Sequence, residues 1–273
     1  HHRLDVYVPE NRPGPLPLMV WIHGGGWKQG DKERCRILPW TEKGYVVASI
    51  NYRLSQQEKF PAQIMDCKAA IRWLRAQADR FNIDANKIVA WGESAGGHLA
   101  SLLGTSGDVA EWGDGARIGS SRVQLVIDWY GRANLGNVCQ DPAMTNSNSA
   151  QLLGGCQDRD SAQLAKKASP IVYVSPDDPP FLIMHGELDQ VVPLSQSEEF
   201  ATALKKAGVE AQLIVIKGAG HGGTAFFQPD KIEIIDNFLS AHLNPRKTTL
   251  GESRDSRASM EPSSKGKFGM SPL

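Results

Sequence analysis

The feature that most constrains the fold is a regular alternation of short apolar segments with stretches of helical period. Leu18–His23 and Tyr45–Asn51 are nearly continuous apolar runs, as expected for strands that are buried on both faces. Gln63–Ala78 places its apolar residues at the spacing of one helix face. The same reasoning predicts further strands at 87–91, 123–129, 180–185 and 211–217, and further helices at 95–103, 195–207 and 231–242. This order predicts an α/β fold in which helices cover both faces of a parallel sheet.

Length and composition favour one domain with two irregular segments. An α/β chain of 273 residues commonly forms a single domain, which we place at 1–244. Residues 131–160 are polar and rich in Gly and Asn, and a connection of this length indicates a lid or a pocket wall. Residues 245–273 contain hardly any large apolar side chains, so we expect a disordered tail outside the fold.

The charge balance argues against a nucleic-acid or membrane partner. The sequence has 30 basic and 30 acidic residues, so no net charge draws it to nucleic acid or to an anionic membrane. No apolar run approaches the roughly 20 residues of a membrane span. Residues 1–8 resemble a strand and not a signal peptide, and they leave open whether a native N-terminus precedes them. A small neutral substrate fits best, and nothing indicates the oligomeric state.

The strongest chemical motif is Gly92-Glu93-Ser94-Ala95-Gly96, which has the pattern G-x-S-x-G and lies between a predicted strand and a predicted helix. A sharp strand-to-helix turn strains the backbone of the serine and raises its hydroxyl above the sheet edge. Side chains two residues to either side would collide in such a turn, which explains the two glycines. The motif predicts that Ser94 is a nucleophile.

A glycine run follows the first buried strand, in the segment His23-Gly24-Gly25-Gly26-Trp27. Acyl transfer requires hydrogen-bond donors for the oxyanion of its tetrahedral intermediate, and backbone N–H groups serve this purpose well. Gly25 and Gly26 are expected to supply two of them, and Ala95, at the start of the helix after Ser94, is expected to supply a third.

A serine hydroxyl needs a base, and the base needs a carboxylate to orient it. Among seven histidines, His221 lies in a glycine-rich loop after the last predicted strand, where a catalytic base is expected. In this fold the carboxylate lies between the serine and the histidine in the chain. Asp189 follows a strand in that interval, and Glu187, two residues earlier, stays open as its rival.

The four cysteines form no CxxC pair and no zinc spacing, so we expect neither a metal nor a cofactor. Cys139 and Cys156 bracket a polar segment and are compatible with a disulfide. Such a bond would indicate an exported protein, and without it the compartment stays open.

Together these motifs resemble those of the α/β-hydrolase superfamily, and within it the carboxylesterases related to hormone-sensitive lipase. The amino-acid sequence of the motifs is more similar still to that of a bacterial group described as lipase/esterase-like or feruloyl-esterase-like. The resemblance covers about residues 3–242, and it is carried by His23–Gly30, Asn51–Leu54, Phe60–Leu74, Gly92–Ser106 and His185–Pro193. It is specific for the fold and the triad, and much less so for the substrate.

The resemblance implies the α/β-hydrolase fold, with a mostly parallel sheet of about eight strands in which the present start supplies the second. It also implies that Trp27, Trp129 and Tyr130 lie near the acyl or alcohol side of a pocket, where aromatic rings would suit a phenolic group. Ordinary core positions for these aromatic residues remain an equal alternative.

The sequence therefore predicts a serine carboxylic ester hydrolase that acts through an acyl-Ser94 intermediate on short-chain or aryl esters, including hydroxycinnamoyl (feruloyl) esters. An acetyl-carbohydrate esterase, such as an acetyl xylan esterase, is the nearest alternative, followed by an acylaminopeptidase-like serine peptidase or a lactonase. A non-catalytic binding protein on the same scaffold is disfavoured, because such proteins usually lose a member of the triad.

Overall fold

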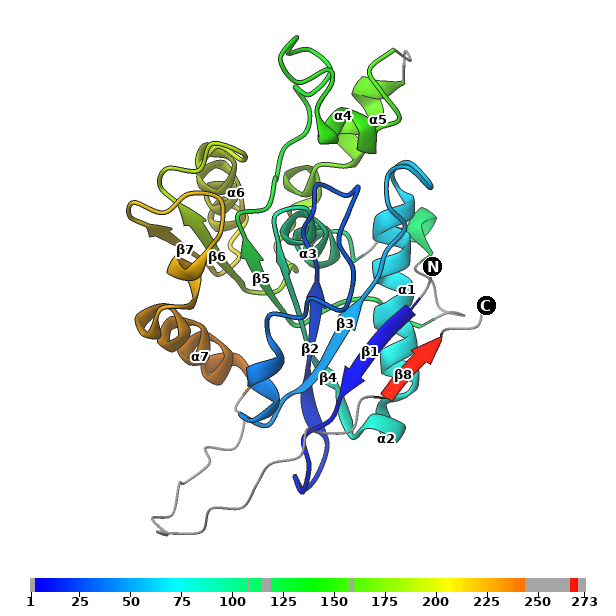
Figure 1. Ribbon diagram of the computed structural model, residues 1–273, viewed down its shortest axis with the longest axis vertical. Helices are drawn as coiled ribbons and strands as arrows, with labels where there is room; N and C mark the ends of the chain where they lie inside the picture. The colour runs from blue at the N-terminus through cyan, green and yellow to red at the C-terminus, as the bar shows by residue number, and fades with distance from the viewer. Residues whose placement is uncertain (1–2, 108, 114–118, 158–159, 244–265, 270–273) are drawn as a thin grey trace.

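The computed structural model describes residues 3–107, 109–113, 119–157, 160–243 and 266–269. It contains an eight-stranded sheet in the order β7-β6-β5-β4-β2-β3-β1-β8 (Figure 1). The strands are β1 Arg3–Tyr7, β2 Leu16–Ile22, β3 Val46–Ile50, β4 Ile83–Glu93, β5 Leu125–Trp129, β6 Phe181–Gly186, β7 Ala211–Ile216 and β8 Gly266–Gly269. Strands β2 to β7 run parallel to one another, and β1 is antiparallel to both β3 and β8.

Helices connect the parallel strands, as the alternating sequence pattern predicts. They are α1 Ala62–Ala76, α2 Ala78–Phe81, α3 Ala95–Thr105, α4 Asn148–Leu152, α5 Ser161–Lys167, α6 Ser195–Lys206 and α7 Pro229–Leu243. Short 3-10 helices occur at η1 Leu38–Thr41, η2 Ala110–Trp112, η3 Pro170–Tyr173 and η4 Thr224–Phe227. The predicted α/β class and the mostly parallel sheet are confirmed, and α4 and α5 lie beyond the carboxyl ends of the strands (Figure 1).

Two apolar clusters bury the two faces of the sheet. Alternate residues of β2 illustrate the division, because Leu18 and Val20 join the cluster under α1, α3 and α6, whereas Met19 and Trp21 join the cluster under α7. A strand buried on both faces has no polar face, which is why its sequence is apolar throughout. The sheet is therefore fixed from both sides, and the loops at its carboxyl end rest on a rigid base.

One short segment of the expected disordered tail forms a strand. Gly266–Gly269 forms β8 and pairs antiparallel with β1, from Arg3 opposite Gly269 to Val6 opposite Gly266. A strand at a sheet edge presents unpaired N–H and C=O groups, and β8 satisfies those of β1. β1 is thus second from this edge, and the edge strand is supplied by the C-terminal segment. The rest of the predicted tail, 244–265 and 270–273, lies outside the described residues, as do His1 and His2.

We predict that Ile71→Ala in α1 lowers the free energy of unfolding by about 2–5 kcal/mol, because Ile71 is fully buried and its loss leaves a cavity. Met65, on the same helix, is 36 % exposed, so Met65→Ala should cost no more than about 0.5 kcal/mol. Urea denaturation followed by circular dichroism measures both changes. Equal losses in the two variants would contradict the assigned inward face of α1.

Candidate active site

Ser94 occupies the sharp turn between β4 and α3, with the left-handed backbone angle φ 53°. Two close backbone approaches create this turn. A Cβ on Gly92 would lie 2.2 Å from the carbonyl oxygen of Gly96, and a Cβ on Gly96 would lie 2.0 Å from that of Ile22. Only glycine fits at these two positions, so the glycines of the motif permit the strained serine between them.

The structure brings Ser94, His221 and Asp189 into one hydrogen-bonded chain. His221 Nε2 lies 2.8 Å from Ser94 Oγ, and His221 Nδ1 lies 2.7 Å from Asp189 Oδ2. Each residue follows the carboxyl end of a strand, Ser94 after β4, Asp189 after β6 and His221 after β7. Because the carboxylate accepts the Nδ1–H of His221, Nε2 is left to accept the Ser94 hydroxyl proton.

Asp189 accepts hydrogen bonds on both of its carboxylate oxygens. Its Oδ1 accepts the backbone N–H groups of Val191 and Val192 at 2.8 and 2.9 Å. Its Oδ2 faces His185 Nε2 at 3.2 Å as well as His221. Burial by itself would raise the pKa of Asp189, but these hydrogen bonds hold it well below its usual range. The carboxylate stays ionised beside His221.

The rival carboxylate, Glu187, makes no contact with the imidazole of His221. Glu187 is exposed, and its Oε2 accepts the backbone N–H of Gly218 at 3.0 Å. The contact geometry therefore favours Asp189 as the partner of His221.

The ring of Tyr130 packs against the imidazole of His221. Its ring meets the imidazole edge-on at 4.6 Å, and its hydroxyl donates to Glu93 Oε2 at 3.1 Å. Arg36 forms an ion pair with the same Glu93 oxygen. Burial, and then the neighbouring Glu93, raise the pKa of Tyr130 far above its usual value, so the phenol remains a neutral donor.

A cavity of about 140 Å³ opens beside Ser94. It is lined by Gly26, Trp27, Ser94, Ala95, Arg132, Met144, Ser147, Asn148, Ser149, Val191 and Val192. Gly26 and Ala95, two of the three predicted oxyanion donors, are therefore beside the nucleophile. Gly25 is not among the residues that line this cavity, and it lines another cavity of about 410 Å³ with His23, Glu93 and other residues.

Trp27 lines the cavity because a buried histidine holds its indole. Trp27 Nε1 donates to His98 Nδ1 at 3.1 Å, and His98 Nε2 donates to the carbonyl oxygen of Ala168 at 2.7 Å. Burial lowers the pKa of His98 to about 4, so this imidazole is neutral near neutral pH and can accept the indole N–H. His98 is a structural residue, as its helical position suggests.

Trp129 does not reach the cavity, which corrects its predicted substrate role. Its side chain is fully buried in the cluster under α7, edge-on to Trp21 and Trp91. Neighbouring residues of a strand point to opposite faces, and Asp128 takes the face toward α3, where it accepts the hydroxyl of Ser101. Only the carbonyl of Trp129 serves the site, since it accepts the N–H of Ser94 at 2.8 Å. Tyr130, packed on His221, is likewise absent from the cavity lining.

Part of the long excursion at 131–160 forms a wall of the cavity through Arg132, Met144 and residues 147–149. Ser147 caps α4 by accepting the N–H of Ala150, which orients the short helix beside Gly26. A disulfide joins Cys139 to Cys156 across this wall.

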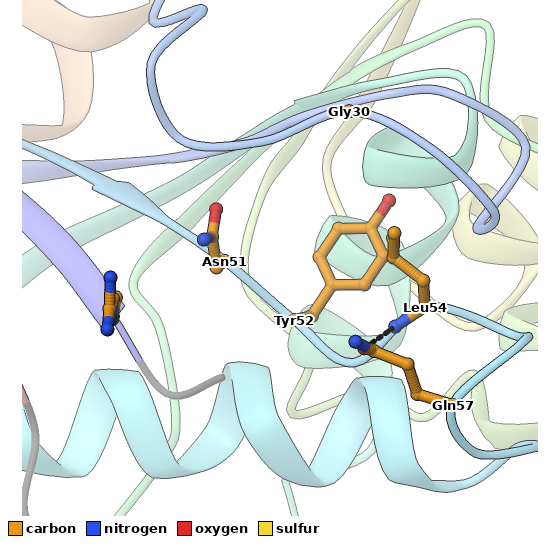
Figure 2. Close-up of a pocket in the computed structure, with 6 residues that line it drawn as sticks. Gly30, Asn51, Tyr52, Leu54 and Gln57 are labelled. Carbon is orange, nitrogen blue, oxygen red and sulfur yellow. Dashed lines mark hydrogen bonds between the residues drawn. The ribbon is translucent and has the colours of Figure 1, made fainter.

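A further cavity, of about 470 Å³, lies at the carboxyl end of β3 and is lined by Arg3, Gly30, Asn51, Tyr52, Leu54 and Gln57. Figure 2 shows these side chains, with the hydrogen bond from the N–H of Leu54 to Gln57 Oε1 as a dashed line. None of the triad residues lines it, but it shares Gly30 with the cavity next to Gly25.

Sequence reasoning missed two residues of the site. Arg132 lines the cavity two positions after Tyr130, and His185 touches Asp189 from the end of β6. Both lie at the carboxyl edge of the sheet, where functional groups of parallel sheets gather, so that position was the available signal.

In the part of the chain that the structure describes, no helix is long and apolar enough to cross a membrane.

The chain is similar in sequence and in structure to known proteins of one family. The family model BD-FAE matches residues 4–204. Esterase LipC of Mycobacterium tuberculosis (strain ATCC 25618 / H37Rv) is 31% identical over 80% of this chain and 56% of its own length. A truncated carbohydrate esterase from gut microbiota superposes with a TM-score of 0.78 at 31% identity, over 88% of this chain and 90% of that one.

A thermophilic esterase from Thermogutta terrifontis, Est2, solved with propionate bound, superposes with a TM-score of 0.74 at 28% identity, over 90% of this chain and 91% of that one. The chain spans about half the length of the curated relatives that it matches.

We predict that Asp189→Asn lowers the rate at which a fluorophosphonate labels Ser94 by about 100-fold or more, because the amide no longer holds the Nδ1–H of His221. Glu187→Gln is the matched control, since Glu187 contacts only a backbone N–H. Gel fluorescence over time gives both rates. A larger loss in Glu187→Gln than in Asp189→Asn would reverse the assignment of the carboxylate.

Proposed function

The chain belongs to the BD-FAE family, and we propose that it is a serine carboxylic ester hydrolase that transfers a short acyl group to Ser94 and then to water. The hydrogen-bonded chain from Asp189 through His221 to Ser94 carries this proposal. The strained turn holds the Ser94 hydroxyl at the wall of a cavity, where a substrate carbonyl can reach it.

The proposed cycle begins when His221 Nε2 takes the proton of Ser94 Oγ as this oxygen attacks the ester carbonyl. The backbone N–H groups of Gly26 and Ala95 stabilise the oxyanion, and Gly25 remains a predicted third donor. The ionised Asp189 stabilises the imidazolium that forms. His221 then gives the proton to the departing alcohol oxygen as the ester bond breaks, which leaves acyl-Ser94.

Hydrolysis of acyl-Ser94 repeats the same steps with water. His221 removes a proton from water as its oxygen attacks the acyl carbon, and then returns the proton to Ser94 Oγ as the acyl–oxygen bond breaks. The products are the acid and the restored hydroxyl. The cycle requires no group beyond the three side chains and the backbone donors.

The size of the cavity supports a short acyl group. At about 140 Å³ it is smaller than the roughly 300–1,000 Å³ of most small-molecule pockets. A hydroxycinnamoyl group, with its ring and side chain, would need more room. Short aliphatic acyl groups therefore fit better than feruloyl groups, in keeping with the propionate bound by the similar esterase Est2.

An acetylated carbohydrate is the second candidate substrate. The cavity of about 410 Å³ next to the glycine loop is lined by polar side chains, among them Gln29, Asp31 and Arg34. Such groups hydrogen-bond to sugar hydroxyls, and a similar structure is a carbohydrate esterase. The alcohol part of the substrate is accordingly proposed to be polyhydroxylated.

The disulfide supports a proposal about the compartment. Disulfides persist in oxidising surroundings and are rare in the cytosol. The bond between Cys139 and Cys156 therefore supports export of this protein.

Replacing the nucleophile tests the proposed activity. We expect Ser94→Ala to lower kcat on short p-nitrophenyl esters by about 10⁴-fold or more, because the hydroxyl of Ser94 is the one that bonds to His221 Nε2 among the residues that the structure describes. Ser120→Ala, at an exposed serine, is the matched control and should retain wild-type turnover. Turnover by Ser94→Ala close to that of the wild type would end the proposal.

A panel of esters tests the proposed acyl size and alcohol. We predict that kcat/KM for methyl ferulate is at least about tenfold below that for methyl acetate or methyl propionate, because the cavity excludes the larger group. Acetylated xylo-oligosaccharides should exceed methyl acetate if the polar cavity binds the alcohol. A preference for methyl ferulate would contradict the size argument.

A further inference from the structure

Arg132 is a cation in the cavity beside Ser94 that forms no ion pair with any residue that the structure describes. It lines that cavity and is partly buried, and its Nη2 donates to the carbonyl oxygen of Val191 at 3.3 Å. None of the carboxylates in the described part of the chain forms an ion pair with it. Among the described residues the bond to Val191 is its one hydrogen bond, which leaves most of the N–H groups of the guanidinium accessible to a ligand or to water.

Asp189, the carboxylate whose charge acts on Arg132, cannot serve as its partner. Burial lowers the pKa of Arg132 and the charge of Asp189 raises it. Both oxygens of Asp189 are already occupied, by His221 and His185 on Oδ2 and by the N–H groups of Val191 and Val192 on Oδ1. Arg132 therefore supports no member of the triad by direct contact.

We infer that this cavity takes the acyl side of an ester bound at Ser94, from the residues that line it. In the tetrahedral intermediate the departing oxygen must face His221 Nε2, which protonates it, while the oxyanion faces the backbone donors. Gly26 and Ala95 line this cavity, and His221 does not. Arg132 accordingly faces the acyl chain and not the alcohol.

Burial of part of a guanidinium costs free energy, and a ligand that accepts its hydrogen bonds offsets that cost. Its planar fork matches a carboxylate, which accepts two parallel N–H bonds. The N-terminus of α3, at Ala95, adds a positive potential to the same cavity. The side chains of Met144 and Val191 offer apolar contacts to a short methylene chain between the ester and a distal charge.

We propose that Arg132 is a specificity-determining residue that binds a carboxylate on the acyl group, so that the preferred substrates are esters of short dicarboxylic acids. This proposal rests on the proposed ester hydrolysis and adds the class of the acyl group. An acyl chain of about four carbons, as in a succinyl half-ester, suits the size of the cavity.

The test compares three methyl esters at neutral pH by measuring acid release in a pH-stat. Monomethyl succinate carries the carboxylate, methyl levulinate has a neutral ketone of nearly the same shape in its place, and methyl pentanoate has neither. We expect kcat/KM for monomethyl succinate to exceed that for methyl levulinate by about 10-fold or more, the range of a hydrogen bond between charged groups.

Variants at Arg132 assign that preference to the guanidinium. Arg132→Gln should lower the succinate-to-levulinate ratio by about 10- to 100-fold, and Arg132→Lys should lower it less, because lysine keeps the charge but not the fork. Arg12→Gln is the matched control, since Arg12 only donates to the carbonyl of Glu42, and it should keep the wild-type ratio.

Two results would overturn the proposal. One is a wild-type ratio of one or less, which needs no variant and therefore does not depend on whether Arg132→Gln folds. The other is an unchanged ratio in folded Arg132→Gln. If the wild type hydrolyses none of the three esters or short p-nitrophenyl esters, the proposed function itself fails, which is a different result from hydrolysis without the preference.

Discussion

The close approach of three backbone segments around Ser94 is the constraint on which the rest of the site depends. β2, β4 and the start of α3 meet so tightly that Gly92 and Gly96 leave no space for a Cβ. This contact forces the left-handed conformation of Ser94 and directs its hydroxyl toward His221. The strain is sustained because both faces of the sheet are buried, so the strands cannot move apart without exposing their apolar side chains.

The carboxyl edge of the parallel sheet gathers residues that are distant in the chain. Ser94 and His221 are 127 positions apart, yet their side chains lie 2.8 Å apart, because β4 and β7 end at the same edge. Asp189 orients His221, and both of its carboxylate oxygens are fully used, by two backbone N–H groups on Oδ1 and by His221 and His185 on Oδ2. Arg132 remains outside this set and faces the cavity, so the same edge supplies both the reacting groups and the proposed acyl recognition.

The sequence predicted the features that depend on local pattern and chain order. Apolar runs located the strands, and the order of Ser94, Asp189 and His221 identified the three side chains that meet. The family resemblance left a pocket position and a core position equally open for Trp129, because a strand that is apolar on both faces does not reveal which face each residue takes. The structure places Trp129 in the core. The sequence also could not distinguish the position of Gly25 from that of Gly26. Both glycines have positive φ, and the path of the turn determines that Gly26 and not Gly25 lines the cavity beside Ser94. Arg132 lies in an irregular loop without periodicity, so only the fold reveals its position.

The most direct measurement of the central claim is peptide mass spectrometry after rapid acid quench of the protein with a short-chain aryl ester. Acid denatures the protein and stops deacylation, so any covalent intermediate is preserved. The account predicts that the peptide containing Ser94 gains the mass of the acyl group within the first turnover. Two results would contradict this account. One is an acyl group attached to a residue other than Ser94. The other is hydrolysis without any covalent adduct under conditions in which deacylation limits the rate.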